Sequence, residues 1–518
     1  MLELLGISHV RRGIRDHAVG VGNHRHDERV SHNVRDSLVR TESPRDRTTC
    51  GRSHREALTH PGRPSGWQQK SAVLSLPRYT SAIAVRLEEN LMSGQRKAAT
   101  GKGLLRLSVV LGACVLALVL GFVPVAQAQT YTVIHNFTGT QDGGMPMAGL
   151  TMDRAGNLLG TTNYGGHTGD NCGARGCGVV YKLTNRNSNW VLTPLYSFLG
   201  GNDGSNPRAA NVVLTADGTL FSTTYYGGGS CSGGSNGCGT VFKLQPQPTA
   251  CNSTICPWNE TVLHSFSGDD GAGPVGALFL DPSGNADGVT STGGFRNGGS
   301  VFQLDASSGW METILFHPYG YPGSSVTPDH AGNLYGSTFI GTSSPGTVYQ
   351  LVQSGQTWIG TDIYAFTGGS DGGYPQAGVI FDGAGNLYGA TTSGGSGGGG
   401  TVFELSPSNG GWNYQVLYSF AGPNNGLLVV GPVGNLIMDS SGSLYGTTIA
   451  DGANGFGAVF KLTPSNGSWS YTSLHDFTGG SDGSSPYCNL VFDASGNLYG
   501  TASAGGAFGS GVVFKITP

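Results

Sequence analysis

Five aspartates are the residues of this sequence whose type and spacing best suit chemistry, because each recurs in the same acidic turn. They are Asp142, Asp203, Asp270, Asp371 and Asp482, and a glycine follows each of them. Repeated carboxylates beside backbone carbonyl groups could bind calcium, which takes several oxygen ligands. Aspartate also caps tight turns with its own side chain. We favour the turn role, because the sequence has no EF-hand loop and no calcium-binding nonapeptide, and we keep the five residues as candidate ligand contacts.

A second candidate group consists of polar residues that are not repeated. His167 and Asp170 precede Cys172 and Cys177 in the most irregular loop of the chain. Enzyme active sites gather acid, base and orienting groups at one place. In an enzyme, we therefore expect the unrepeated polar residues, which are His167, Asp170, Arg175, Arg208 and Arg296, to meet at one mouth of a channel. In a scaffold they are expected to be scattered.

The glutamates give little indication of catalysis. Glu260 and Glu312 occupy the same slot of a repeated strand, and Glu404 stands where other copies carry lysine. We interpret all three as solvated strand positions. The sequence has no HExxH and no phosphate loop. We therefore predict no catalytic residue, no cofactor and no metal ligand, with calcium left open, and we favour a protein that is not an enzyme.

Six cysteines form three local pairs, which are Cys172/Cys177, Cys231/Cys238 and Cys251/Cys256. Metal binding is the alternative, but no histidine stands beside them at ligand spacing and no CxxC occurs. The pairs therefore predict disulfides that close short loops in an oxidising compartment. Each would contribute about 2 kcal/mol on the chain-entropy model. Cys488 has no neighbouring cysteine, which predicts a buried thiol.

One repeated unit must position all of these residues. It begins with a strand of the type W-x-x-T-x-L-Y-S-F, as in Trp190–Phe198, and continues through the acidic turn into an apolar strand. The unit then continues with the turn D-x-x-G-N, the strand L-Y-G-T-T, a glycine-rich loop and the strand G-T-V-F-K-L. Seven copies of this unit, each with four strands of about five or six residues, predict an all-β fold, a seven-bladed β-propeller of four-stranded antiparallel blades. The aromatic residues of L-Y-G and V-F-K are expected in the core between blades.

The ends of the repeat array predict how the ring closes. The last copy ends at Pro518 without a strand of the first type, whereas Tyr131–Phe137 is such a strand at the other end of the array. We expect Tyr131–Phe137 to pair into the last blade, which removes the open sheet edges.

A second aspartate set belongs to the D-x-x-G-N turns. It comprises Asp153, Asp281, Asp329, Asp382, Asp439 and Asp493. A ring of metal ligands is the alternative, but a side-chain cap followed by a positive-φ glycine explains the pattern better.

Charge divides the chain into two parts. Residues 1–128 hold 19 Lys and Arg against 10 Asp and Glu, whereas residues 129–518 hold 9 against 22. Residues 1–91 have no sustained apolar period, so we predict an upstream extension from a misassigned start; a disordered basic tail is the alternative. Residues 92–128 have the three parts of a signal peptide, with a retained membrane anchor as the alternative. The propeller then spans 129–518, is extracytoplasmic, and has no membrane span after cleavage.

The unit resembles the bacterial extracytoplasmic tandem repeat called GloVer. The resemblance rests on D-x-x-G-N-L-Y-G-T-T followed by G-T-V-F-K-L, as at 439–448, with Ser443 in place of Asn, and at 493–501, and it covers residues 131–518. More loosely, the unit looks like the NHL repeat. That likeness implies that the strand after the acidic turn lines the channel, that the strand ending in Phe is outermost, and that the acidic turns share one face with the glycine-rich loops.

These observations favour a secreted binding or scaffold propeller that contacts a glycan, a cell-wall polymer or a cell-surface protein through one loop face. A carbohydrate-active hydrolase or lyase, or a purely structural surface protein, are the alternatives. The acidic balance of residues 129–518 argues against a nucleic-acid partner. We expect a monomer.

Overall fold

The computed structural model describes residues 129–517, apart from 170, 188, 209–210, 233–235, 248–257 and 423–429. The extension predicted for residues 1–91 and the signal peptide predicted for 92–128 lie outside the described residues. Both stay predictions. Across the described part, no helix combines the length and the apolar character that crossing a bilayer requires.

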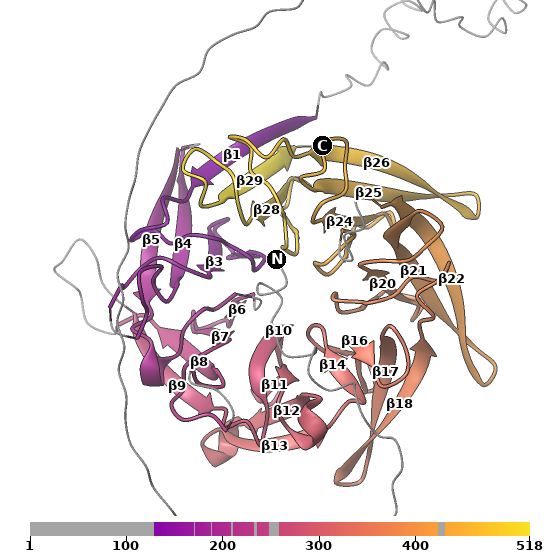
Figure 1. Ribbon diagram of the computed structural model, residues 1–518, viewed down its shortest axis with the longest axis horizontal. Helices are drawn as coiled ribbons and strands as arrows, with labels where there is room; N and C mark the ends of the chain where they lie inside the picture. The colour runs from indigo at the N-terminus through magenta and orange to yellow at the C-terminus, as the bar shows by residue number, and fades with distance from the viewer. Residues whose placement is uncertain are drawn as a thin grey trace, which may run out of the picture. The chain divides into compact units, whose positions relative to one another are not determined.

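Seven antiparallel sheets stand around a central axis, which confirms the seven-bladed β-propeller (Figure 1). Each sheet runs from an innermost strand at the axis to an outermost strand at the rim. The innermost strands are β2 (Thr151–Met152), β6 (Val213–Leu214), β10 (Ala272–Leu280), β14 (Gly320–Pro322) with β15 (Thr327–Pro328), β19 (Ile380–Phe381), β23 (Ile437–Met438) and β27 (Val491–Phe492). The second strands are β3 (Leu158–Thr162), β7 (Leu220–Thr224), β11 (Ala286–Thr292), β16 (Leu334–Gly341), β20 (Leu387–Thr391), β24 (Leu444–Thr448) and β28 (Leu498–Ala502).

The two outer layers carry the longer strands. The third strands are β4 (Val179–Arg186), β8 (Thr240–Gln245), β12 (Ser300–Asp305), β17 (Thr347–Ser354), β21 (Gly398–Ser408), β25 (Ala458–Ser465) and β29 (Val512–Thr517). The outermost strands are β5 (Asn189–Ser197), β9 (Asn259–Ser265), β13 (Met311–Phe316), β18 (Thr357–Ala365), β22 (Gly411–Ala421), β26 (Ser468–Asp476) and β1 (Thr130–Asn136). Short 3-10 turns occur at η3 (Gly201–Asp203), η4 (Phe295–Asn297) and η5 (Ala306–Ser308).

The ring closes as the sequence predicts. Strand β1 pairs antiparallel with β29, with Tyr131 opposite Ile516 and Asn136 opposite Val512. The last blade therefore takes its outermost strand from the start of the propeller. The order of strands within each sheet also confirms that the strand after the acidic turn is innermost and that the strand ending in Phe is outermost.

The innermost strands differ from the expected length of five or six residues. In five blades the innermost strand has two residues, as in β2 and β23. The blades converge at the axis, and the backbone just before these strands bonds to the neighbouring blade instead of extending its own ladder. The N–H of Gly149 donates to Asn211 Oδ1 over 2.8 Å, and that of Gly378 donates to Asn435 Oδ1 over 2.7 Å.

The core lies between blades, as the aromatic pattern predicts. The Phe at the end of an outermost strand packs edge to face against the aromatic residue of the third strand of the next blade. Examples are Phe198 with Phe242 and Phe420 with Phe460, whose ring centroids are 5.1 Å apart in both pairs. All four side chains are almost completely buried. Each blade is therefore stabilised by its neighbours, and the apolar residues of a single sheet have no core of their own.

The D-x-x-G-N aspartates hold turns. Asp382 Oδ1 accepts the backbone N–H of Ala384 and of Asn386, and its Oδ2 accepts the Asn386 side chain. The same backbone bonds form at Asp153, Asp281, Asp329, Asp439 and Asp493. Gly385 has a φ of +85°, which a residue with a side chain rarely adopts. The predicted turn role is confirmed.

Candidate functional site

The five acidic turns share one internal hydrogen-bond pattern. Each aspartate accepts a backbone N–H from the residue that follows the Phe at the end of the W-x-x-T-x-L-Y-S-F segment, which we call the Phe position. Asp371, for example, accepts the N–H of Thr367 over 2.8 Å. Each also bonds to the side chain two residues before the Phe position, which is His135, Tyr196, His264, Tyr364 or His475. The carboxylates are thus committed to the turns that contain them.

Electrostatics separate one of these turns from the other four. Burial raises the pKa of Asp142, Asp270, Asp371 and Asp482, but hydrogen bonds to their carboxylates outweigh burial and hold each pKa below its usual value. In Asp203 burial prevails and the pKa is raised, and Asp203 Oδ1 is buried without a hydrogen-bond partner in the described structure. In four of the turns the surroundings therefore favour the ionised carboxylate, whereas the surroundings of Asp203 favour the ionised form less than water does.

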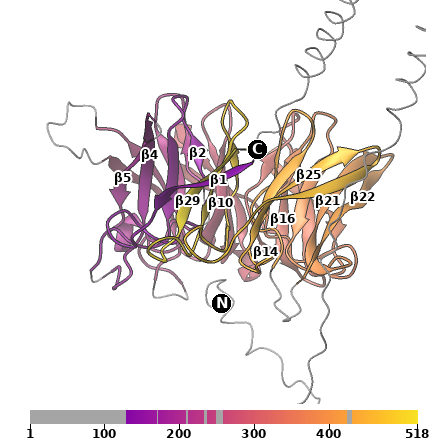
Figure 2. The same cartoon turned by 90° about the horizontal axis from the view of Figure 1, so that it is seen from above.

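The acidic turns and the glycine-rich loops lie at the same end of the blades. Single antiparallel bridges join them within a blade, between Gly144 and Tyr164, between Ser205 and Tyr226, between Gly373 and Ser393, and between Ser484 and Ala504. We call this side, made of the acidic turns and glycine-rich loops, the loop face. Figure 2 shows the ring edge-on. The shared face implied by the NHL likeness is confirmed, although the five aspartates are spread around it, each in its own turn.

Large apolar side chains are exposed on the loop face. Phe295, Phe456 and Phe508 stand in glycine-rich loops and are 59%, 46% and 62% exposed. Leu199 and Tyr319 follow the Phe position of their own blades and are exposed as well. Phe295, Phe456 and Phe508 were not predicted from the sequence, because each is the single large apolar residue of its glycine-rich loop.

The predicted residues of the irregular loop are partly described. His167 is exposed, whereas Asp170 lies outside the described residues. The Cys172–Cys177 and Cys231–Cys238 disulfides are present, as predicted. The third pair, Cys251 and Cys256, lies outside the described residues. Cys488 is a buried free thiol, as predicted, and it accepts the backbone N–H of Thr501.

The central channel contains amide and hydroxyl side chains from several blades. Its lining includes Arg208, Asn211, Gln376, Asn435, Tyr487 and Asn489, and Arg208 is the one charged residue among the lining residues that the structure describes. The Arg208 guanidinium lies over the Tyr225 ring, 3.8 Å from its centre. Arg175 and Arg296 instead lie over Tyr164 and Phe295 in glycine-rich loops. The unrepeated polar residues that are described do not all meet at the channel.

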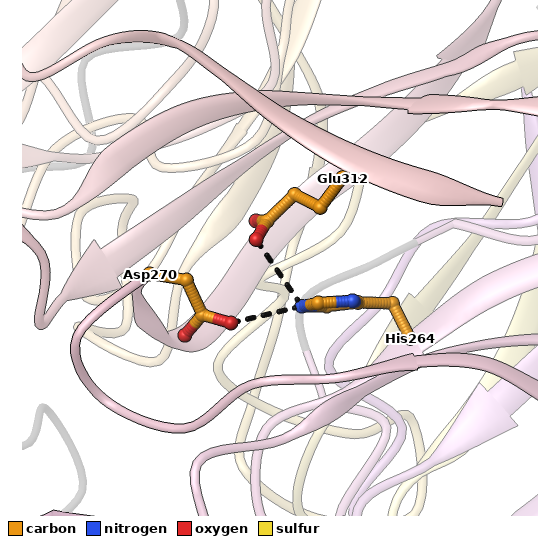
Figure 3. Close-up of side chains that lie close together, drawn as sticks. All are labelled: His264, Asp270 and Glu312. Atoms are coloured by element: carbon orange, nitrogen blue, oxygen red, sulfur yellow. Dashed lines mark hydrogen bonds and ion pairs between the residues drawn. The ribbon is translucent and has the colours of Figure 1, made fainter.

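One cluster of three ligand-type side chains stands out in the described part of the chain. It consists of His264 on β9, Asp270 in the following turn and Glu312 on β13 of the next blade (Figure 3). His264 Nε2 lies 3.0 Å from Asp270 Oδ2 and 3.4 Å from Glu312 Oε2. Burial raises the pKa of Glu312 to about 7, although His264 opposes the shift, while hydrogen bonds from His264 and Ser267 bring the pKa of Asp270 down to about 2.

This cluster corrects the interpretation of the glutamates as solvated. Glu260 and Glu312 are half-buried, and burial together with the Asp203 charge raises the pKa of Glu260 to about 7. Glu404 is half-buried too, and burial raises its pKa. The slot of Glu260 and Glu312 points into the seam between two blades, not into solvent. The sequence held a sign of this, because other copies place Tyr131, Tyr414 and Tyr471 in that slot.

Comparison with known families identifies the repeat. The family model for the Gloeobacter/Verrucomicrobia repeat matches residues 122–338 and 321–518. The chain belongs to this family. The match confirms the resemblance found in the sequence. No functionally curated protein matches the chain.

Solved structures share limited similarity with this member of the repeat family. A gluconolactonase from Xanthomonas campestris is 15% identical, with 50% of this chain and 74% of that chain covered and a TM-score of 0.32. A protein described as a putative gluconolactonase is 13% identical, with 77% and 94% covered and a TM-score of 0.36. A putative oxidoreductase (glucose dehydrogenase) from Thermus thermophilus is 12% identical, with 75% and 100% covered and a TM-score of 0.36.

Proposed function

We propose that this repeat-family protein is a secreted binding propeller whose loop face contacts a glycan of the cell surface or cell wall. The observation that carries the proposal is the exposure of Phe295, Phe456 and Phe508 at glycine-rich loops of one face. Flat aromatic side chains offer a large apolar contact area. The apolar faces of sugar rings suit such contacts.

Two disulfides support an extracytoplasmic location. Cys172–Cys177 and Cys231–Cys238 close short loops next to the loop face, and such bonds persist in oxidising compartments. The predicted signal peptide at 92–128 would deliver the chain to such a compartment. The excess of acidic residues in 129–518 makes a nucleic-acid partner a poor fit.

The composition of the channel makes the enzyme alternative weaker. Most glycoside hydrolases flank the scissile bond with two carboxylates. Among the described residues that line the channel, Arg208 is charged and the others are amide, hydroxyl or apolar groups. The amides are already engaged, as when Asn435 donates its backbone N–H to Asn489 Oδ1 over 2.6 Å. The described channel thus offers no pair of carboxyl groups to act as acid and base.

Binding of the purified protein to a glycan array and to insoluble cell-wall polysaccharide tests the proposal. The triple variant Phe295→Ala, Phe456→Ala, Phe508→Ala should bind at least about tenfold more weakly, a loss of about 1.4 kcal/mol. The matched control is Met311→Ala with Ile359→Ala, which removes exposed apolar side chains from the outer rim. Arrays that stay negative, or equal binding by the triple variant and the wild type, would refute the proposal.

A further inference from the structure

The seams between blades follow a rule at the outer rim. In an outermost strand, the residue two positions before the Phe position meets a residue in the outermost strand of the next blade. That residue stands in one slot of the repeat, two positions after the place where the motif carries Trp. At three seams the two rings stack, in the pairs Tyr364–Tyr414, Tyr418–Tyr471 and His475–Tyr131, with centroids 4.0, 4.7 and 3.7 Å apart. At these three seams the slot therefore holds an aromatic ring that packs the seam, whereas the other four copies carry Leu192, Glu260, Glu312 and Gly360 there.

The seam between the second and third blades has no such ring stack. Glu312 stands in the slot that holds tyrosine at those three seams, and it faces His264 in place of a stacked ring. The Glu312 side chain is only 11% exposed, and its Oε1 atom is buried and has no hydrogen-bond partner in the described structure. An unpaired carboxylate oxygen at such a place costs free energy unless something binds it.

The two distances from His264 match those between ligands of one metal ion. Donor atoms bound to zinc at about 2.0 to 2.2 Å lie roughly 3.3 to 3.6 Å apart in a tetrahedral site, and about 2.9 Å apart at right angles. His264 Nε2 is 3.0 Å from Asp270 Oδ2 and 3.4 Å from Glu312 Oε2, and the three donor atoms all lie within 4.8 Å of one another (Figure 3). No large rearrangement is needed to bring them onto one ion.

The charge of the cluster also favours a cation. Two carboxyl groups share one imidazole, and none of the ion pairs of the described chain brings a lysine or arginine to Asp270 or Glu312. Imidazole nitrogen with carboxylate oxygen is a donor set suited to zinc and similar divalent transition metals. The three side chains remain 11% to 20% exposed, so an ion can reach them from solvent.

We propose that His264, Asp270 and Glu312 bind one divalent transition-metal ion, with Zn²⁺ as the first candidate. The ion would join β9 of one blade to β13 of the next at the outer rim. Because these are outermost strands, the site is separate from the channel and its role is structural. At this seam it would take the place of the ring stack found at three other seams. The proposal does not depend on the binding function of the loop face.

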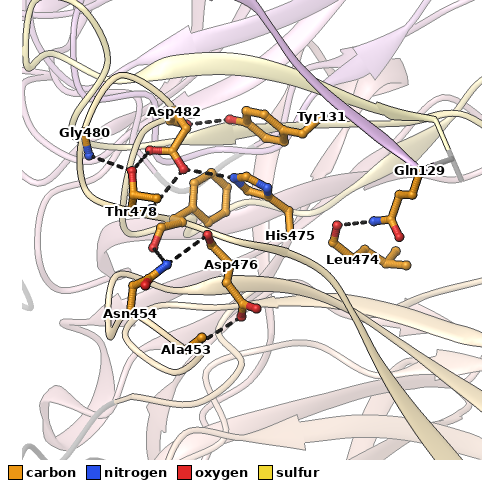
Figure 4. A network of polar contacts seen from close by, with 11 residues as sticks. Gln129, Tyr131, Ala453, Asn454, Leu474, His475, Asp476, Thr478, Gly480 and Asp482 are labelled. Carbon is orange, nitrogen blue, oxygen red and sulfur yellow. Dashed lines mark hydrogen bonds and ion pairs between the residues drawn. The ribbon is translucent and has the colours of Figure 1, made fainter. Parts of the chain in front are cut away.

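The matched control is the seam closed by β1. His475 Nε2 lies 3.1 Å from Asp482 Oδ2, the same pairing as His264 with Asp270, but Tyr131 stands in the place of Glu312 (Figure 4). Figure 4 also shows Tyr131 donating to the Asp482 carbonyl oxygen and Gln129 to that of Leu474. This seam has the histidine and the aspartate without the third ligand.

The test uses the purified, untagged protein, stripped with EDTA and titrated with ZnCl₂ by calorimetry. Zinc should bind the wild type and His475→Ala alike, and it should raise the melting temperature of both. In Glu312→Gln and His264→Ala the affinity of that site should fall by more than about tenfold, with the zinc-dependent rise in melting temperature lost. Because residues 1–128 contain other histidines, the deciding quantity is the difference of one zinc equivalent between wild type and variant.

Some outcomes would overturn the site. Equal zinc binding by the wild type, Glu312→Gln and His264→Ala would show that these residues hold only a hydrogen-bonded cluster. Restoration of the melting temperature by CaCl₂ but not by ZnCl₂ would refute a transition-metal site. If the variants fail to fold, removing metal from the wild type with EDTA and adding zinc back still tests the proposal. A melting temperature that does not change in this cycle would contradict the proposed metal site.

Discussion

Replacing Glu260 with glutamine should stabilise the protein at neutral pH and have almost no effect in acid. Glu260 lies at the seam between the first two blades, where burial and the nearby Asp203 charge raise its pKa from 4.5 to about 7. Glu260 Oε1 is buried without a hydrogen-bond partner in the described structure. Folding therefore favours the neutral carboxyl group, and glutamine imitates that neutral form with nearly the same shape.

The sign and size of the effect follow from proton linkage. Between pH 4.5 and about 7 the folded state keeps a proton at Glu260 that the unfolded state has lost, so stability falls as pH rises through this window. The pKa difference corresponds to at most roughly 3 kcal/mol, since one pKa unit equals about 1.36 kcal/mol. Glu260 is only half-buried, and solvent screening reduces the expected penalty to about 1 kcal/mol.

Thermal and urea unfolding of wild type and Glu260→Gln, followed by circular dichroism from about pH 4 to pH 8, measures this difference. The variant should be more stable by about 1 kcal/mol near pH 8 and equal within about 0.5 kcal/mol near pH 4. Glu404→Gln is the matched control, because Glu404 lies on a third strand away from Asp203, and it should show a smaller change. A difference between wild type and Glu260→Gln that is independent of pH would refute the reasoning.

The repeat itself suggests a stronger substitution at the same position. Tyr414 occupies the equivalent slot in another blade and stacks on Tyr364. At the Glu260 seam the place of Tyr364 is taken by Tyr196, which donates a hydrogen bond to Asp203. Glu260→Tyr should therefore remove the buried carboxylate and add a ring stack worth about 0.5 to 1.5 kcal/mol. A melting temperature below that of Glu260→Gln would show that this seam has no room for the ring.

Three further substitutions and one labelling experiment test other parts of the fold. Phe137→Ala should lower the free energy of unfolding by about 3 to 5 kcal/mol, because the fully buried ring packs between the last and first blades, and denaturant titration measures it. Asp382→Ala should cost about 1 to 3 kcal/mol through lost turn bonds, and Cys172→Ser with Cys177→Ser about 2 kcal/mol, both by calorimetry. Cys488, whose pKa burial raises to about 11, should resist iodoacetamide near pH 8 until the protein is denatured, as mass spectrometry of its peptide would show. Costs near zero, or rapid labelling of the native protein, would contradict these assignments.

Repetition made the fold readable from sequence. Strands, turns and loops recur in the same order, so Asp382 could be assigned to a turn and Phe460 to the core without coordinates. The position of Tyr131–Phe137 relative to the last copy was enough to predict closure by β1 and β29. The two described disulfides could be predicted because their cysteines are close in the chain.

The candidate sites were less readable, because they depend on contacts between copies. His264 and Glu312 belong to different blades, and each looked like an ordinary strand residue within its own repeat. The exposure of Phe508 depends on how its loop leaves the blade.

The sequence by itself thus determined the blade, the number of blades and the way the ring closes, since these follow from local spacing and covalent order. Only the tertiary structure decided which side chains meet at a seam and which stay in solvent. The physical reason is that an outermost strand buries its inward residues against the next blade, so their surroundings come from a segment that local spacing does not specify.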